Sequence, residues 1–351
     1  MNKKVLNDVV IIRLLLIVLL VLYHSFAIYN GAWDMPNDIH AVKSYYWIAS
    51  LSYSFMLETF VFISGYVFGY QVRTKFGNNV DFHNCVTKKA KRLLVPSIVF
   101  SAIYFIIFNI QQGNTWGGIF YNIIIGEGHI WFLPMLFLCF VGIYLFELLK
   151  FSPKIVIVLA IIASLFSLGP LADLPFRISK AMYYFLFFVI GYYLQKFNIS
   201  IERFARVKLI TLLLVVYLIT FLLYQHLLLE NLNIGTTERS TLTRFANSFL
   251  RRFLRITQAI GGLFMSLSLV NYMLNNNLIH VSSLAIKLSG YCFGVYVFQQ
   301  FILKWIITNP YMINALGSIY LPWVAFLLAF MLSLFMTHIM LKTKFGRFLV
   351  G

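Results

Sequence analysis

The sequence predicts an all-α polytopic membrane protein with about ten transmembrane helices and both termini in the cytoplasm. Three observations predict this fold class. Of the 351 residues, 61% are hydrophobic and only 11% are charged, against about a quarter charged in a soluble domain. The apolar residues gather in runs of the length that a helix needs to cross a bilayer. Most of the positive charge falls in the short segments between these runs.

The apolar runs follow one another along the whole chain, separated by short polar or basic segments. In order, they are roughly 9–29, 45–72, 93–111, 130–149, 155–172, 181–196, 208–229, 254–274, 284–307 and 320–341. The first run follows Lys3 and Lys4, but it is too long for a signal peptide and lacks a small-residue cleavage site. We therefore expect a retained first helix. The sequence shows no soluble domain between the runs and no clear internal repeat. We therefore expect a single membrane domain over 1–351.

The net charge of +17 could indicate a nucleic-acid partner, but its distribution indicates membrane orientation instead. With the N-terminus placed in the cytoplasm, most Lys and Arg residues lie in inner segments, and no nucleic-acid-binding motif is present. One outer segment departs from this rule. The loop 230–253, with the start of the next run, contains Arg239, Arg244, Arg251, Arg252 and Arg255. Either this loop binds an acidic group, or the runs beside it are misplaced.

Two ionisable residues lie within the first apolar run, "RLLLIVLLVLYH", which extends from Arg13 to His24. At 100° per residue, the spacing is about three turns plus 20°, so both side chains share one helix face, about 16 Å apart along the axis. Arg13 would sit near the cytoplasmic end and His24 in the outer half. A lone arginine could extend to the inner headgroups, and a lone histidine could be structural. Ionisable groups within a bilayer more often mark function.

Glu58 lies in the second apolar run, which returns toward the cytoplasm. Counting back from the end of that run places Glu58 about 21 Å above the cytoplasmic side, and His24 lies about 22 Å above it. A carboxylate and an imidazole at the same depth could pair. Such a carboxylate would orient the ring and raise its basicity. The residues therefore predict a catalytic group of His24, Arg13 and Glu58.

The first run resembles the start of the acyltransferase-3 family, whose first helix carries an Arg, ten intervening residues and a His. Four further segments are similar to family motifs and occur in the same order. They are "FVFISGY" (60–66), "KKAKRLLVP" (88–96), "GHIWFLP" (128–134) and "CFGVYVFQQ" (292–300). Two positions depart from the family pattern: Gln299 stands where the late segment often has His, and Glu58 where an apolar residue or proline is commoner.

The resemblance implies transfer of an acyl group, usually acetyl, from cytoplasmic acyl-CoA to a hydroxyl of a cell-surface polysaccharide or lipid-linked glycan. It also implies a multi-pass protein of a bacterial cytoplasmic membrane. A sugar hydroxyl is a poor nucleophile, so a general base is needed, and His24 is the best candidate. Because "ISG" (63–65) does not form a GxSxG elbow, we expect direct transfer without an acyl-enzyme. No metal and no tightly bound cofactor are expected.

The polyanionic donor, acetyl-CoA or another acyl-CoA, would need cations at the inner side of the membrane. The candidates are Arg13, Arg73, Lys88, Lys89, Lys91 and Arg92. Ordinary orientation signalling or anionic-lipid binding would explain the basic run equally well. For the acceptor, the candidates at the outer end of the fourth run are Glu127, His129 and Trp131, which could instead form part of an interfacial aromatic belt.

A transporter or flippase of lipid-linked sugars is the alternative, because it would also combine many spans with intramembrane charges. It should show an inverted repeat and broken helices near mid-membrane, and the sequence shows neither. A structural or lipid-sensing protein would not require Arg13, His24 and Glu58 together. The acyltransferase therefore remains the favoured prediction.

Overall fold

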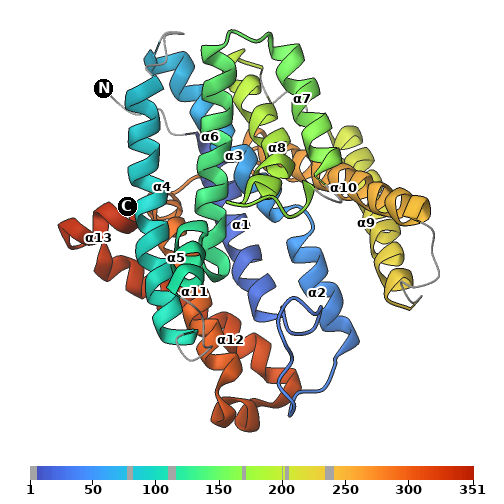
Figure 1. Cartoon of the computed structure of the whole chain (residues 1–351), viewed down its shortest axis with the longest axis vertical. Coiled ribbons are helices and arrows are strands. Elements are labelled where there is room, and N and C mark those ends of the chain that lie inside the picture. Colours follow the sequence, from blue (N-terminus) through green and yellow to red (C-terminus); the bar gives the residue numbers. More distant parts are fainter. Residues whose placement is uncertain are drawn as a thin grey trace. The chain divides into compact units, whose positions relative to one another are not determined.

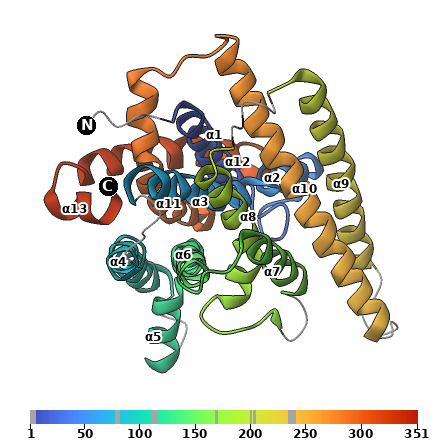
Figure 2. The ribbon, with the colours of Figure 1, turned by 90° about the horizontal axis from the view of Figure 1, so that it is seen from above.

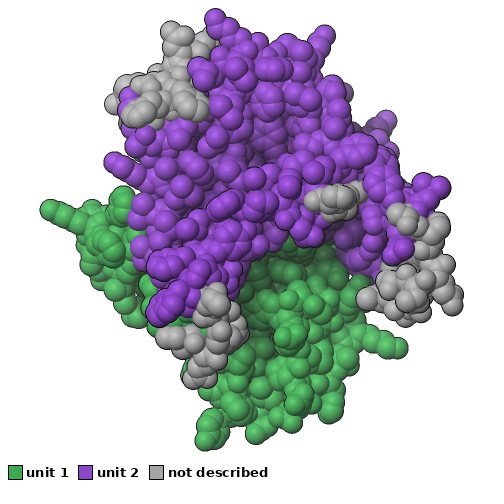
Figure 3. All heavy atoms as spheres, viewed as in Figure 1, with its two compact units in different colours: residues 1–56, 103–109, 279–351 green, residues 57–102, 110–278 purple. Residues whose placement is uncertain are grey.

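The computed structural model describes residues 6–76, 82–109, 116–167, 171–199, 201, 205–233 and 241–351. Every regular element within these residues is helical, which confirms the all-α prediction (Figure 1). The chain forms two compact units, coloured separately in Figure 3. Unit 1 comprises 1–56, 103–109 and 279–351, and unit 2 comprises 57–102 and 110–278. The single domain expected over 1–351 stays a prediction.

The chain is a polytopic membrane protein. Among the described residues, 7 helical segments are long and apolar enough to cross a membrane. They are Asn7–Ser25, Lys43–Thr74, Asn84–Phe108, Gly128–Leu148, Val207–Leu229, Leu242–Asn275 and Pro310–Met340. The predicted runs 155–172, 181–196 and 284–307 also form helices, but the first of these is short and the other two carry more polar side chains. The number of spans and their sidedness stay predictions.

Unit 1 is built around α1 (Asn7–Ser25), which packs against α2 (Lys43–Tyr53), α11 (Ser283–Thr308) and α12 (Pro310–Met340). The longest shared surface in this unit joins α11 and α12, and α13 (Lys344–Val350) packs beside both. Asn309 makes the turn between α11 and α12. Its side-chain oxygen accepts hydrogen bonds from the backbone N–H groups of Tyr311 and Met312, at 3.0 and 3.3 Å. Pro310 follows at the first helical position, where its missing N–H costs nothing.

The first half of α12 is broken, and side chains that follow α1 bind the carbonyls at the break. Gly317 has a φ of +60° inside the helix, a conformation that glycine adopts without strain. Pro322 has no N–H, so the carbonyl of Ser318 lacks its helical donor. The Tyr29 hydroxyl donates to that carbonyl instead, and the Tyr45 hydroxyl donates to the next carbonyl, that of Ile319, at 3.0 Å. The segment after His24 is thereby fixed to unit 1.

Unit 2 contains the middle of the chain. Its elements are α3 (Met56–Gln71), a π-helical turn (Val72–Phe76), α4 (Phe82–Phe108, in this unit to residue 102), α5 (Trp116–Ile125), the short 3-10 helix η2 (Gly128–Trp131), α6 (Phe132–Leu148), α7 (Pro153–Phe166), α8 (Ile178–Lys196), α9 (Val207–Asn233) and α10 (Thr241–Asn275). α8 packs against α6 and α7, and α9 lies along α10 (Figures 1 and 2). The mostly buried α8 is the centre of this unit.

The boundary predicted before the run 254–274 was wrong. Residues 241–275 form one helix, α10, so Arg244, Arg251 and Arg252 are helical rather than part of an outer loop. The rest of the predicted loop lies partly outside the described residues. Arginines were taken as loop residues because they are costly in a membrane, yet helical arginines are tolerated where they find partners. The helix thus begins before the predicted run 254–274, and this error is the reason why its arginines were counted in an outer loop.

Two other boundaries also differ. The second run, 45–72, is not one helix, because α2 ends at Tyr53 and α3 begins at Met56. The Ser54 hydroxyl donates to the Leu51 carbonyl at 2.6 Å and closes the end of α2. The basic residues 88–92, which precede the predicted run 93–111, lie within α4, and Pro96 lies inside that helix. Membrane helices tolerate such prolines when neighbouring groups satisfy the freed carbonyl.

Close packing of α3 on α8 explains two glycines of the segment 60–69. A Cβ on Gly65 would lie 2.1 Å from the carbonyl oxygen of Phe188, and a Cβ on Gly69 would lie 2.2 Å from that of Tyr192. On the facing helix, a Cβ on Gly191 would lie 2.2 Å from the Phe62 carbonyl oxygen. This is the small-xxx-small geometry that lets two membrane helices approach closely.

We expect Gly65→Ala to lower the free energy of unfolding by about 1–3 kcal/mol, because the added methyl group overpacks a backbone contact. Thermal unfolding of the detergent-purified protein measures the loss. Gly117→Ala is the matched control, because a Cβ there meets nothing within 4 Å and alanine favours a helix over glycine. Equal melting temperatures for Gly65→Ala and wild type would contradict the packing described here.

Candidate active site

His24 is buried in the last turn of α1 and is surrounded by aromatic rings of unit 1. Its imidazole stacks on Trp33, with ring centroids 5.7 Å apart and an interplanar angle of 16°. The ring of Tyr23 lies 5.0 Å away on the same helix, and Tyr23 in turn stacks on Tyr53 at 4.3 Å. Stacking of this kind fixes the plane of the imidazole. Trp33 belongs to the loop that Tyr29 fastens to α12.

Gln299 of α11 sets the state of the His24 ring. The His24 Nδ1 atom lies 3.2 Å from the Gln299 Oε1 atom, and Gln299 is fully buried. An amide oxygen can only accept, so this contact favours a hydrogen on Nδ1, and in the neutral ring the lone pair is then at Nε2. The Gln299 Nε2 atom is buried and has no hydrogen-bond partner among the described residues. The site therefore holds a ring nitrogen able to accept a proton, together with an unused amide donor.

Arg13 and His24 lie on the same helix, as predicted, and α11 contacts both residues. The Cys292 thiol of α11 donates to the Arg13 carbonyl at 3.7 Å, while Gln299 meets His24 further along the two helices. Residue numbers rise in the same direction on α1 and α11, so the two helices pack in parallel. Arg13 is half-buried and lies about 16 Å along the axis from His24.

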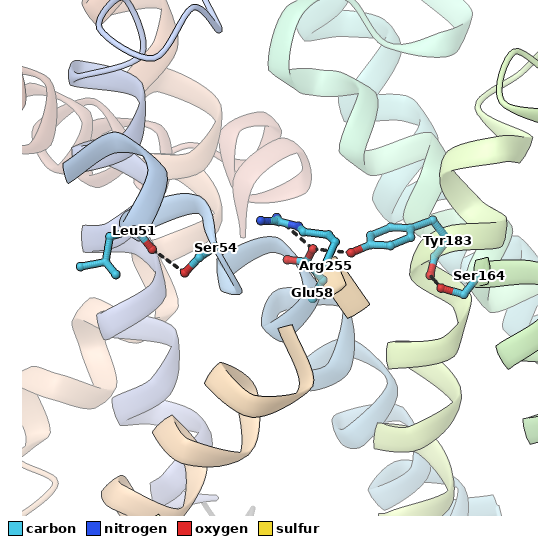
Figure 4. A network of polar contacts seen from close by, with 6 residues as sticks. All are labelled: Leu51, Ser54, Glu58, Ser164, Tyr183 and Arg255. Carbon is cyan, nitrogen blue, oxygen red and sulfur yellow. Dashed lines mark hydrogen bonds and ion pairs between the residues drawn. The ribbon is translucent and has the colours of Figure 1, made fainter. Parts of the chain in front are cut away.

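Glu58, in the first turn of α3, is fully buried in unit 2. One of its oxygens, Oε1, lies 3.0 Å from the Arg255 Nη2 atom and accepts a hydrogen bond from the Tyr183 hydroxyl at 2.9 Å (Figure 4). Tyr183 is positioned in turn, because its backbone carbonyl accepts from the Ser164 hydroxyl at 3.0 Å. The other carboxylate oxygen, Oε2, is buried without a hydrogen-bond partner among the described residues.

Within the two units, Arg255 and Tyr183 engage the Glu58 carboxylate, and Gln299 holds the His24 ring. Arg255 reaches Glu58 because α10 continues into the predicted loop, and a guanidinium is a strong partner for a buried carboxylate. The predicted pairing of Glu58 with His24, and with it a catalytic role for Glu58, stays a prediction.

The basic candidates for donor binding form two groups. Lys88, Lys91 and Arg92 are exposed on the first half of α4. Lys89 turns inward, and its ammonium lies 4.1 Å from the Phe140 ring centroid and 5.5 Å from that of Phe68. This cation–π contact gives Lys89 a structural role in unit 2, whereas the donor-binding role expected of the exposed members stays a prediction.

Arg73 lies in the π-helical turn after α3. Its guanidinium donates to the side-chain oxygen of Asn198 and lies 5.5 Å from the Tyr70 ring centroid. These contacts hold the turn against the end of α8, where Asn198 follows. A role of Arg73 in donor binding stays a prediction.

The segment predicted to meet the acceptor is a tight turn leading from α5 into η2. Gly126 and Gly128 have φ values of +86° and +54°, which glycine tolerates. The Arg177 guanidinium closes the turn by donating to the carbonyls of Ile125 and Gly126 at 3.2 and 3.1 Å. Burial lowers the pKa of Arg177, and the nearby Glu127 carboxylate opposes this shift.

The three acceptor candidates differ in burial and in their contacts. The Glu127 backbone N–H donates to the Ser101 hydroxyl at 3.0 Å, and its side chain is half-buried. His129 is buried. The ammonium of Lys180 covers the Trp131 ring at 3.8 Å from its centroid. One face of the indole is therefore occupied, so a sugar could stack there only on the other face or after Lys180 moves.

The fold and this site define a polytopic membrane protein with a buried, oriented imidazole and an unused amide donor beside it. A family model described as an acyltransferase domain, that of the acyltransferase-3 family, matches residues 7–341, nearly the whole chain. The chain belongs to this family and is a membrane acyltransferase. The resemblance inferred from the motifs is thereby confirmed. No curated protein and no solved structure matches the chain.

Proposed function

We propose that this acyltransferase moves an acetyl group from cytoplasmic acetyl-CoA to a hydroxyl of a cell-surface polysaccharide or lipid-linked glycan in a bacterial cytoplasmic membrane. The contact between the His24 Nδ1 atom and the Gln299 Oε1 atom carries the proposal. It supports a neutral ring with its lone pair at Nε2, as a general base requires.

In the proposed reaction, Nε2 of His24 takes the proton of the acceptor hydroxyl while the hydroxyl oxygen attacks the thioester carbonyl. The carbonyl oxygen gains negative charge, and the unused N–H donors of Gln299 Nε2 can stabilise it. The carbon–sulfur bond then breaks. The leaving thiolate takes the proton back from the imidazolium, which restores the neutral ring and yields the ester and free CoA.

The donor would approach from the side that the positive charge marks as cytoplasmic. Its phosphates require cations, and the exposed Lys88, Lys91 and Arg92 of α4 supply them. Arg13, about 16 Å from His24 along α1, would meet the long pantetheine arm or its thioester. This assignment of the donor rests on charge and on depth along the helix.

Gln299→Met should lower kcat by about 10²–10³ with little change in KM, because the loss of an oxyanion donor acts only in the transition state. Gln299→Glu retains an acceptor for the Nδ1 hydrogen but has no N–H donor, so it should be impaired as well. Single-turnover acetyl transfer by the purified enzyme measures both variants. Wild-type kcat in Gln299→Met would remove the residue from the mechanism.

Replacing Lys91 and Arg92 together with Gln should raise the KM for acetyl-CoA several-fold at low salt, because two exposed cations contribute to binding a polyanion. The kcat should change little. Lys154→Gln serves as the control, since Lys154 is an exposed cation at the start of α7. If the double variant only alters membrane insertion, these residues serve topology and not the donor.

The function is tested in cells by the O-acetyl content of the surface glycans, measured by NMR in a deletion strain. Complementation with wild type should restore O-acetyl groups that the deletion loses, while His24→Ala should not restore them despite normal insertion. The glycan that loses the signal is the acceptor. If acetylation is unchanged but less glycan reaches the surface, the protein is a transporter and the proposal fails.

A further inference from the structure

Three arginines lie on one face of α10: Arg251, Arg252 and Arg255. Arg255 follows Arg252 by three residues and Arg251 by four, so Arg255 lies one turn from each of them on the helix surface. Arg255 is paired with Glu58 at 3.0 Å. Among the described residues, Arg251 and Arg252 meet only neutral groups, so they carry two positive charges without a countercharge there.

The contacts of Arg251 and Arg252 with neutral groups do not satisfy all of their N–H donors. Arg252 donates to the Ser167 carbonyl at 2.9 Å and lies over the Tyr183 ring at 4.7 Å. Arg251 has a long contact of 3.4 Å with the Ser248 hydroxyl on its own helix. The Nε atom of Arg251 is buried and has no hydrogen-bond partner in the described part of the chain. A buried guanidinium donor without an acceptor is costly, and an anionic oxygen would satisfy it.

The length of α10 indicates how deep in the membrane Arg251 and Arg252 lie. The helix has 35 residues, or about 52 Å, whereas the hydrocarbon layer is about 30 Å thick. The excess lies at the polar beginning of the helix, because the apolar run starts only near residue 254. Arg251 and Arg252 therefore fall near the boundary between hydrocarbon and headgroups, where lipid phosphates are found.

We propose that Arg251 and Arg252 bind the phosphate of a lipid-linked saccharide, which serves as the acceptor. The inference rests on the proposed function, since it names the class of acceptor for the same enzyme. Guanidinium groups match phosphate oxygens in geometry and charge, and the boundary position suits a phosphate that joins a lipid tail to a sugar. One helical turn after Arg251 and Arg252, the Glu58 carboxylate holds Arg255 in place.

Binding of radiolabelled farnesyl phosphate to the purified full-length protein, in phosphatidylcholine nanodiscs and without acyl donor, tests the site. Wild type should bind saturably, and farnesol should not compete. Arg251→Gln and Arg252→Gln should each weaken binding roughly tenfold, as expected when a hydrogen bond to a charged group is lost. Arg251→Lys should weaken it less, and Lys154→Gln should bind as wild type does.

Three results would overturn the proposal. They are an unchanged Kd in folded Arg251→Gln, equal competition by inorganic phosphate, and displacement by an equal amount of phosphatidylglycerol, which would indicate an ordinary headgroup site. Since the described residues give Arg251 a single, long contact, the one with Ser248, its variant should keep the melting temperature of wild type. His24→Ala should bind normally, so a failure of the transfer chemistry remains distinguishable from a failure of this site.

Discussion

Under the proposed function, substitution of His24 with alanine is expected to lower kcat/KM for acyl transfer by about 10²–10⁴, the contribution of a positioned general base. The ring that is lost is the one whose Nδ1 atom is held by Gln299 and whose plane is fixed by Trp33. Purified enzyme with a soluble sugar acceptor provides the measurement, and the melting temperature checks that the variant is folded.

His338→Ala is the matched control for this loss. His338 is also a histidine of unit 1 and makes a hydrogen bond, with its Nδ1 atom 2.9 Å from the Tyr291 hydroxyl, but it is exposed on α12. It should retain wild-type kinetics. If His24→Ala and His338→Ala have equal activity, the base lies elsewhere and the role assigned to the imidazole is wrong.

Arg255→Gln is expected to have the largest effect on stability, lowering the free energy of unfolding by about 3–5 kcal/mol. Within the described part of the chain, it leaves the buried Glu58 carboxylate with the Tyr183 hydroxyl as its one donor, and an uncompensated buried charge is costly. Thermal unfolding and size-exclusion chromatography in detergent would record the loss. Arg244→Gln, which alters an exposed arginine of the same helix, should be neutral.

The double variant Glu58→Gln with Arg255→Gln separates charge burial from packing. Removing both charges of a buried pair is often neutral, so the double variant should recover much of the stability that Arg255→Gln loses. Non-additivity of this kind is the signature of a direct pair. Additive losses would show that Glu58 and Arg255 act independently, contrary to the contact described.

Much of the fold could be predicted, because membrane helices are defined by the length and composition of one segment. The helix that carries Arg13 and His24 follows from its own residues, and so does their shared face. The predicted helix boundaries were wrong where a partner far away in the sequence lowers the free-energy cost of placing a charged residue in a membrane helix. Arg251 and Arg252 suggested a loop, yet they lie in α10, where Arg252 contacts the Ser167 carbonyl and the Tyr183 ring.

The site was only half predicted, for the same reason. Gln299 was noted as a departure from a family motif, but nothing in the local pattern placed its amide against His24. Trp33 was missed altogether, because an aromatic residue in an outer loop has no distinguishing periodicity. The signal available was Gln299 itself, a polar residue within an apolar run, where such residues usually have a specific partner.

The contact between His24 and Gln299 spans 275 positions of the chain, and this separation governs when the enzyme can become active during its synthesis. At 5–20 residues per second, Gln299 is made roughly 14–55 s after His24. Until then, the imidazole of the first helix lacks the amide that holds it in the finished protein. A chain truncated before Gln299 would therefore contain His24 without the contact that orients its ring.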